Sequence, residues 1–154
     1  MKRELSFLKT SNYSSSFREK QGPKEINLLD ENPFDEIADV PGVYIIASSD
    51  NTQFIYPKGK NSVIYIGKSE HLIQRLKTHK RHLEFVMSND ENLLRNRIQM
   101  FQRYQYMSSF GAKVFIYYCR KTQDAKEMES YILQRFYEKY RALPVGNGAR
   151  SFFE

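Results

Sequence analysis

Two short apolar runs near the middle of the chain have the composition of β-strands. Residues 43–47 (VYIIA) follow a Pro-Gly pair, and residues 63–66 (VIYI) end at Gly67. Both runs are dominated by β-branched and aromatic side chains, which favour strands. The polar stretch 48–62 between them therefore predicts an antiparallel hairpin with a long loop.

Apolar residues at helical spacing follow on both sides of a third strand. Ser69 can cap the first helix, whose apolar stripe includes Leu72, Leu76 and Leu83, and Asp124 can cap the last helix. The predicted order is strand, strand, helix, helix, strand, helix, which makes the chain α+β. The last four predicted elements cover residues 69–83, 91–107, 113–119 and 124–140.

The N-terminal part has a different pattern. Residues 1–24 are polar and serine-rich, which predicts an arm or a short capping segment, whereas residues 25–40 carry scattered apolar positions and should pack across the domain. We therefore expect segment 1–40 to precede one folded domain, residues 41–154, which is large enough for a core of its own.

The charge is unevenly distributed, and this suggests a partner. Residues 1–40 hold 6 Lys/Arg against 8 Asp/Glu, while residues 41–154 hold 18 against 10. A basic domain that also holds most of the Tyr and Phe suits a polyanion such as nucleic acid. A basic surface that serves solubility alone would have the same composition.

Other features bear on the cellular setting. No apolar run approaches the length needed to cross a bilayer, and the N-terminus lacks the pattern of a secretory signal. The single cysteine, Cys119, cannot form an internal disulfide and lies in an apolar run, so we expect it to pack in the core. These features predict a cytoplasmic protein with no membrane partner.

The first predicted helix carries a stripe of cationic and titratable side chains. At about 100° per residue, Arg75, His79 and His82 fall side by side along one edge of the apolar stripe. The guanidinium of Arg75 could bind a phosphate, and the imidazole of His79 could transfer a proton. The alternative is an ordinary amphipathic helix with a basic rim.

One carboxylate lies within an apolar stripe. On the last predicted helix, Glu129 has Ala125 four residues before it and Ile132 and Leu133 just after it at helical spacing. A carboxylate at a core edge is costly unless it meets a cation, a metal or a donor. Glu129 is therefore the best metal-ligand candidate, with a salt bridge to an arginine as the alternative.

The two predicted strands each contribute a tyrosine. Alternation places Tyr44 with Ile46 on one face of its strand and Tyr65 with Val63 on one face of the other. In matching register the two phenols emerge near each other, with Lys68 just beyond. Such tyrosines usually pack, but a phenol near cations can act as a base.

The order and spacing of these residues resemble the GIY-YIG nuclease superfamily. Pro-Gly-Val-Tyr in the first strand, Tyr-Ile-Gly-Lys-Ser from the second strand into a helix, and the later polar residues match its motifs over about residues 40 to 148. The resemblance implies a small three-stranded antiparallel sheet flanked by helices, and a GIY-YIG nuclease domain over residues 41–154. The polar residues that match the motifs of the superfamily are Tyr44, Tyr65, Arg75, His79, Glu129 and Asn147.

The resemblance also implies a role for each position. Tyr44 corresponds to the tyrosine that activates or positions the attacking water, Tyr65 to the one near the scissile phosphate, and Arg75 to the arginine that stabilises the transition state. His79 stands where homing and restriction members have a histidine, Glu129 where the metal-binding carboxylate stands, and Asn147 where a supporting asparagine stands. Asn147 precedes Gly148, so it could instead be a turn former.

The resemblance implies hydrolysis of DNA phosphodiesters with one Mg²⁺ (or Mn²⁺), in a restriction-like, phage or mobile-element setting. Further contacts with DNA are predicted for Lys68, Lys77, Lys80 and Arg81, and a homodimer could form on DNA. A structure-specific repair nuclease, or a nucleic-acid-binding module of the same fold without cleavage, remains open. Val43 departs from the usual isoleucine, and the 48–62 loop is longer than in compact members.

Overall fold

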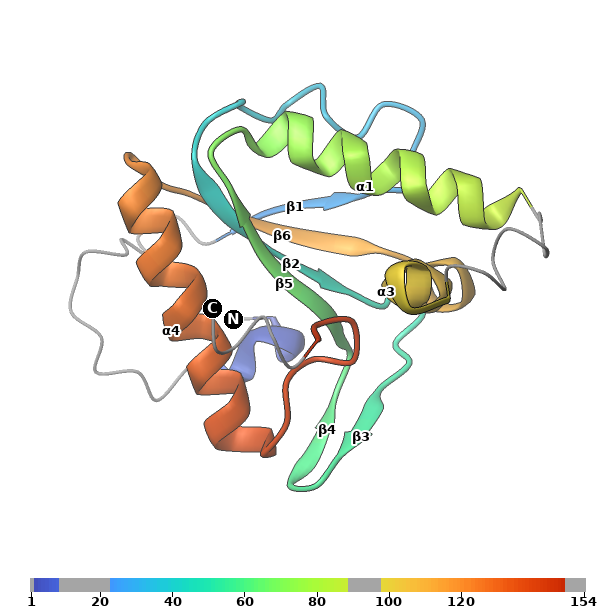
Figure 1. Ribbon diagram of the computed structural model, residues 1–154, viewed down its shortest axis with the longest axis vertical. Coiled ribbons are helices and arrows are strands. Elements are labelled where there is room, and N and C mark those ends of the chain that lie inside the picture. The colour runs from blue at the N-terminus through green and yellow to red at the C-terminus, as the bar shows by residue number, and fades with distance from the viewer. Residues whose placement is uncertain (1, 9–22, 89–97, 149–154) are drawn as a thin grey trace.

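The computed structural model describes residues 2–8, 23–88 and 98–148. Two sheets and three α-helices account for most of them (Figure 1). In chain order the elements are the 3-10 helix η1 (Arg3–Leu8), β1 (Lys24–Asn27), β2 (Gly42–Ala47), β3 (Phe54–Tyr56), β4 (Gly59–Asn61), β5 (Val63–Ser69), α1 (Leu72–Met87), α3 (Ile98–Phe110), β6 (Lys113–Tyr118) and α4 (Thr122–Tyr140).

The main sheet has four antiparallel strands in the order β1-β6-β2-β5. The predicted α+β class is therefore confirmed, as is the antiparallel pairing of the two tyrosine strands. The predicted number of three strands is wrong, because β1 pairs with β6 and adds a fourth. β1 has the sequence KEIN, with one apolar residue, and such a strand carries no hydrophobic pattern that could reveal it.

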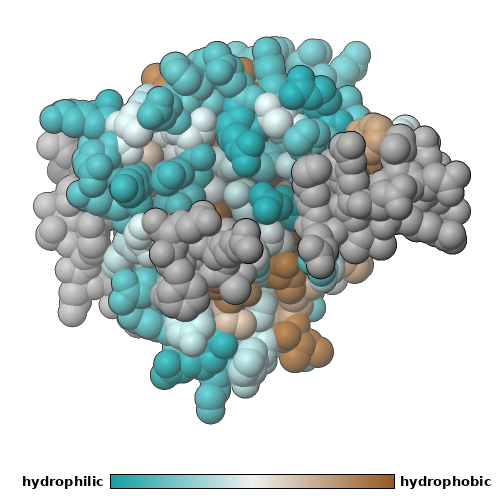
Figure 2. Space-filling view, in the orientation of Figure 1, coloured by the Kyte–Doolittle hydropathy of each residue, from teal (hydrophilic) through white to brown (hydrophobic). Residues whose placement is uncertain are grey.

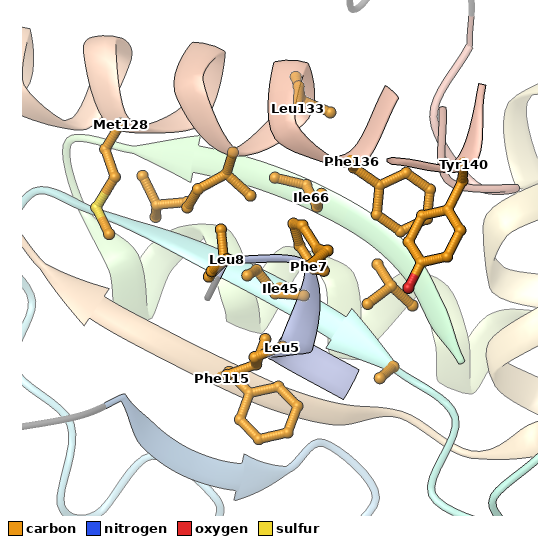
Figure 3. Close-up of a cluster of buried hydrophobic side chains, with 14 of the residues drawn as sticks. Leu5, Phe7, Leu8, Ile45, Ile66, Phe115, Met128, Leu133, Phe136 and Tyr140 are labelled. Atoms are coloured by element: carbon orange, nitrogen blue, oxygen red, sulfur yellow. The ribbon is translucent and has the colours of Figure 1, made fainter. Parts of the chain in front are cut away.

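The sheet separates two hydrophobic cores. α4 and η1 cover one face, and α1 and α3 cover the other (Figure 1). In the first core, Phe7 of η1 packs edge-to-face on Phe136 of α4, with ring centroids 5.2 Å apart (Figure 3). Leu5 and Leu8 are buried in the same core. Whether segment 1–40 forms a unit apart from 41–154 stays a prediction, but its first described residues belong to this core.

The predicted loop 48–62 contains a hairpin of its own. β3 and β4 pair antiparallel as a second, two-stranded sheet. The hairpin is tied to the rest of the fold at Tyr56, whose hydroxyl accepts a hydrogen bond from the Val145 amide at 3.1 Å. The prediction of a plain loop was therefore wrong, and the strands escaped notice because each is only three residues long, FIY in β3 and GKN in β4.

β5 differs from its predicted form in two ways. It continues through Gly67 to Ser69, because the backbone of β2 extends to Gly42 and supplies partners for those residues. A β-bulge also shifts the register beside Ile46 and Ala47. As a result Val63 and Tyr65 pack in different cores, and the prediction that they share a face was wrong.

The helices begin and end at different residues from those predicted. α1 begins at Leu72, because the Ser69 hydroxyl hydrogen-bonds the backbone of His71 instead of capping the helix. α4 begins before Asp124, which lies in its first turn. The structure describes α3 from Ile98 to Phe110, and the predicted start of that helix at residue 91 lies outside the described residues. Among the described residues, no helix combines the length and the apolar character of a membrane span.

Candidate active site

Four of the predicted site residues come together on the α1–α3 side of the sheet. The Tyr44 hydroxyl lies 2.7 Å from Nε2 of His79 and 3.4 Å from Nε of Arg75. The Tyr44 and Tyr65 rings are 6.0 Å apart between centroids, and the Arg75 guanidinium also reaches the Tyr65 hydroxyl. The expectation that the two phenols would lie near each other is confirmed.

The backbone of the two strands creates the space for this cluster. β2 and β5 pair Tyr44 with Gly67, so the Tyr44 ring lies over a residue without a side chain. A Cβ atom at Gly67 would be 2.5 Å from the Tyr44 hydroxyl and 2.8 Å from the Tyr65 ring. The glycine of the Tyr-Ile-Gly motif is therefore needed for close packing of both tyrosines.

α1 supplies the arginine and the histidine from successive turns. The residues are four apart, so both side chains emerge on the same face of the helix. His79 was expected along one edge of the apolar stripe, and its side chain is fully buried, so the alternative of an ordinary basic rim does not hold for this residue. The reason is tertiary, since α3 packs on α1 and places the Tyr104 hydroxyl 2.8 Å from Nδ1 of His79.

These contacts form a chain of hydrogen bonds. Arginine can only donate, so the Tyr44 oxygen accepts from Arg75. The Tyr44 hydroxyl also bonds Nε2 of His79, whose Nδ1 bonds the Tyr104 hydroxyl, and the tautomer of the imidazole sets which group donates at each nitrogen. The Tyr104 hydroxyl also lies 3.2 Å from Nδ1 of His82. The chain leads from a buried phenol to a half-buried histidine.

The surroundings keep the buried pair neutral. Burial lowers the pKa of His79 to about 3, and the cations of Arg75 and Arg103 add to this effect. Burial, with the neighbouring Tyr65, raises the pKa of Tyr44 well above its ordinary value, and Arg75 offsets part of that rise. At neutral pH the contact therefore joins a phenol to a neutral imidazole.

Two residues of α3 complete the cluster and were missed in the sequence. Tyr104 bonds His79, and the Arg103 guanidinium lies 4.2 Å from the centroid of the Tyr65 ring, a cation–π distance. Both stand in a helix without a recognisable motif. Their spacing along the chain carries no signal, because their function depends on how α3 packs across α1.

Glu129 lies apart from the tyrosine cluster. α4 covers the opposite face of the sheet, and the charged neighbour of Glu129 is Lys68, which follows Gly67 on β5. The carboxylate is half-buried and forms no hydrogen bond or ion pair with a described residue, so the alternative of a salt bridge to an arginine is not observed. Burial raises its pKa, and Lys68 opposes that rise.

Asn147 holds the outer edge of β5. Its side-chain oxygen accepts from the Ile66 amide at 3.0 Å, and its side-chain nitrogen donates to the Ile66 carbonyl at 2.9 Å. The preceding Gly146 amide donates to the Ile64 carbonyl at 2.6 Å. Asn147 therefore stabilises the strand that carries Tyr65 and Gly67.

The four predicted substrate-binding cations differ in their surroundings. Lys68, Lys77 and Arg81 are exposed. Lys80 is half-buried, donates to the carbonyl oxygens of Leu28 and Asp30, and so anchors the segment after β1 to α1.

Cys119, expected in the core, packs half-buried against the α4 side, and burial raises the pKa of its thiol to about 11.

Glu129 could hold a metal ion only if the substrate supplied further ligands. Within the described residues, no group of three or more His, Cys, Asp or Glu is placed to hold a metal ion. Mg²⁺ commonly takes one or two carboxylates and fills its shell with phosphate oxygens and water. Glu129, which bonds no other residue in the described part of the chain, is compatible with that arrangement.

Comparison with protein-family models, with curated proteins and with solved structures finds no match to this chain.

Proposed function

We propose that the chain is a divalent-metal-dependent endonuclease of the GIY-YIG type that hydrolyses DNA phosphodiesters. One observation carries the proposal: an arginine, two tyrosines and a histidine meet around Gly67, and the next residue, Lys68, adjoins a carboxylate that has no bonded partner among the described residues. The cluster combines a fixed positive charge with groups that can hold or move a proton, as in-line attack on a phosphodiester requires.

Each side chain then has a role set by its exposure. Arg75 is half-buried and Tyr65 is 9 % exposed, whereas Tyr44 and His79 are fully buried, so the first two would bind the phosphate oxygens. Tyr44 and His79 lie beneath them. Tyr44 accepts a hydrogen bond from Arg75, which orients the guanidinium, and its contact with Nε2 of His79 holds the phenol in place.

Glu129 would hold the cation, together with phosphate and water oxygens. When bound, the cation neutralises charge that develops on the scissile phosphate. Lys68 stands between Glu129 and Gly67 and would bind the adjoining phosphate as a point charge. The carboxylate and the tyrosine cluster would thus act from the two faces of the edge strand β5.

The second candidate is a nucleic-acid-binding module without cleavage. The complete burial of Tyr44 and His79 favours it, because neither side chain can touch a water molecule in this arrangement. The basic charge of residues 41–154 would serve either function.

Plasmid cleavage with Mg²⁺ separates the two candidates. The wild-type protein should convert supercoiled plasmid to nicked or linear DNA. Glu129→Ala should reduce the rate of cleavage by about a hundredfold or more, because it removes the protein's ligand to the cation, and it should still bind the plasmid. The matched control is Glu127→Ala, since Glu127 is exposed on the same helix and, within the described ranges, bonds Gln123 alone.

Full activity in Glu129→Ala would exclude this metal site. Binding of plasmid by the wild type without cleavage in Mg²⁺ or Mn²⁺ would establish the second candidate instead.

A further inference from the structure

A basic cleft lies at the other end of β5. It has a volume of about 380 Å³ and is bounded by η1, the β3–β4 hairpin and the end of α4. Four cations line it, Arg3, Lys58, Lys60 and Lys139, and the one acid among its lining residues is Glu4. Teal side chains gather where the hairpin turn and the end of α4 lie (Figure 2).

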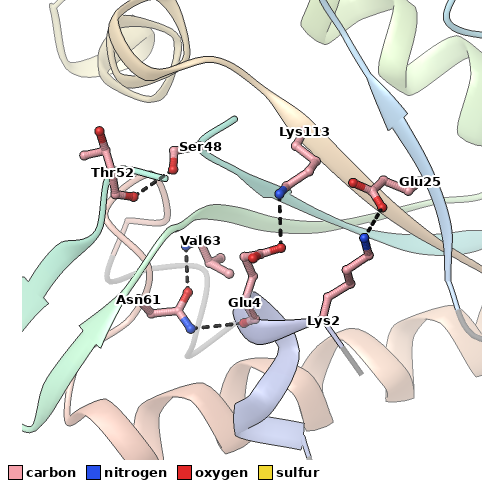
Figure 4. A network of polar contacts seen from close by, with 8 residues as sticks. All are labelled: Lys2, Glu4, Glu25, Ser48, Thr52, Asn61, Val63 and Lys113. Carbon is pink, nitrogen blue, oxygen red and sulfur yellow. Dashed lines mark hydrogen bonds and ion pairs between the residues drawn. The ribbon is translucent and has the colours of Figure 1, made fainter. Parts of the chain in front are cut away.

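The four cations are not neutralised within the described part of the chain. None of them forms an ion pair there. The Glu4 carboxylate instead lies 3.2 Å from Nζ of Lys113, away from the lysines of the hairpin (Figure 4). Like charges gathered without counter-charges repel one another, and a bound polyanion removes that cost.

The cleft is built on a buried polar residue. Asn61 is 3 % exposed, and its side-chain nitrogen donates to the Glu4 carbonyl and to the Tyr140 hydroxyl, each at 3.0 Å. Its side-chain oxygen accepts from the Val63 amide at 2.7 Å (Figure 4). One side chain therefore joins η1, the hairpin and α4, the three elements that carry the cations.

We propose that this cleft binds the phosphodiester backbone of duplex DNA, at a point distant from the cut. The inference rests on the proposed function, and it adds a second contact with the same substrate. The stretch of chain from Asn61 to Gly67 spans about 20 Å at about 3.3 Å per residue. For a duplex that runs along β5, with phosphates on one strand about 3.4 Å apart along the axis, the cleft contacts DNA about six base pairs from the scissile phosphate.

Binding of duplex DNA without metal tests the cleft independently of cleavage. Lys58→Ala/Lys60→Ala should weaken binding about tenfold and reduce the slope of log Kd against log salt by about 2, because each lost phosphate contact removes about 0.9. The matched control is Lys2→Ala/Lys24→Ala, which removes the same charge from ammonium groups paired with Glu25 and Glu36. This control should bind like the wild type.

The length of the duplex gives a second readout. On a duplex with only about four base pairs on each side of the cut, wild type and Lys58→Ala/Lys60→Ala should bind equally, because the DNA no longer reaches the cleft. Charge reversal, Lys58→Glu/Lys60→Glu, should weaken binding to the long duplex further. Unchanged affinity in both hairpin variants would overturn the cleft as a DNA site, even if the wild type binds and cuts.

Two other results would also count against the inference. A wild-type protein that does not bind duplex DNA would overturn the cleft and the proposed function together. Binding of inorganic phosphate that depends on Lys58 and Lys60, with duplex affinity unaffected by the same substitutions, would identify a free anion as the ligand and overturn the DNA assignment.

Discussion

His79 illustrates how much a single side chain depends on its partners. Its two ring nitrogens bond the hydroxyls of Tyr44 and Tyr104, and no part of it is exposed. A buried polar group that is fully bonded stabilises one arrangement of the core, whereas a charged imidazole in the same place would be strongly disfavoured. The stability of the protein should therefore report the protonation of this residue.

We predict that the free energy of unfolding falls as the pH is lowered from about 6.5 toward about 3. Folded His79 takes up a proton only near pH 3, whereas the unfolded residue does so near its ordinary value of 6.5. Between these values the unfolded chain binds more protons, so acid favours unfolding. The contribution is fully present above pH 6.5 and is lost by up to about 1.4 kcal/mol per pH unit below it.

Urea unfolding of the wild type and of His79→Gln over pH 4–7 measures this contribution. The carboxylates titrate in both proteins, so the difference between the two curves isolates His79. His79→Gln should be less stable at pH 7, and its deficit should shrink as the pH falls. A difference that stays constant across this range would show that His79 is protonated normally in the folded protein.

At the scale of elements, β5 connects every part of the site. It is the last strand of the main sheet, and it carries Tyr65, Gly67 and Lys68. The edge of such a strand exposes unpaired amide and carbonyl groups. Here the segment after α4 covers that edge through Gly146 and Asn147. The geometry of the site therefore depends on a segment that is remote in sequence.

We predict that Asn147→Ala lowers the free energy of unfolding by about 2–4 kcal/mol. The substitution leaves the amide and the carbonyl of Ile66 buried without partners, and each such group costs about 1–3 kcal/mol. Chemical denaturation measures the loss. Gly148→Ala is the matched control, because an added Cβ there meets nothing within 4 Å. Equal stability of the two variants would exclude this role of Asn147.

At the scale of the molecule, the described residues supply one set of the proposed catalytic residues. They contain one Glu129, one Arg75 and one buried Tyr44–His79 pair. One such set is enough for one in-line displacement, on one strand. The two strands of DNA run in opposite directions, so cutting both requires a second set or a second event. A homodimer with two-fold symmetry would place one set on each strand and would suit a palindromic target.

We predict that one protomer cuts one strand in each event. If the protein acts as a monomer, nicked circles should accumulate before linear plasmid appears. If it acts as a dimer, linear product should form directly, with a steep dependence on protein concentration. A time course of plasmid cleavage at several protein concentrations distinguishes these cases. Direct linearisation by a protein shown to stay monomeric on DNA would contradict the prediction.

The sequence determined the elements whose side chains repeat with a regular period. The runs 43–47 and 63–66 form paired strands, and the helices that contain Leu72 and Ile132 form near their predicted positions. Local hydrophobic patterns suffice for such elements, because each buries a face whose spacing is set by the backbone itself. The same local information placed Tyr44 near Tyr65.

Only the tertiary structure decided what each candidate residue contacts. β1 has no apolar pattern and exists because β6 offers an edge to pair with. Tyr104 joins the site because α3 packs on α1 and buries His79. Glu129 lies across the sheet from that histidine because α4 covers the other face. Such contacts join residues far apart in the chain, and no local spacing encodes how two elements will pack.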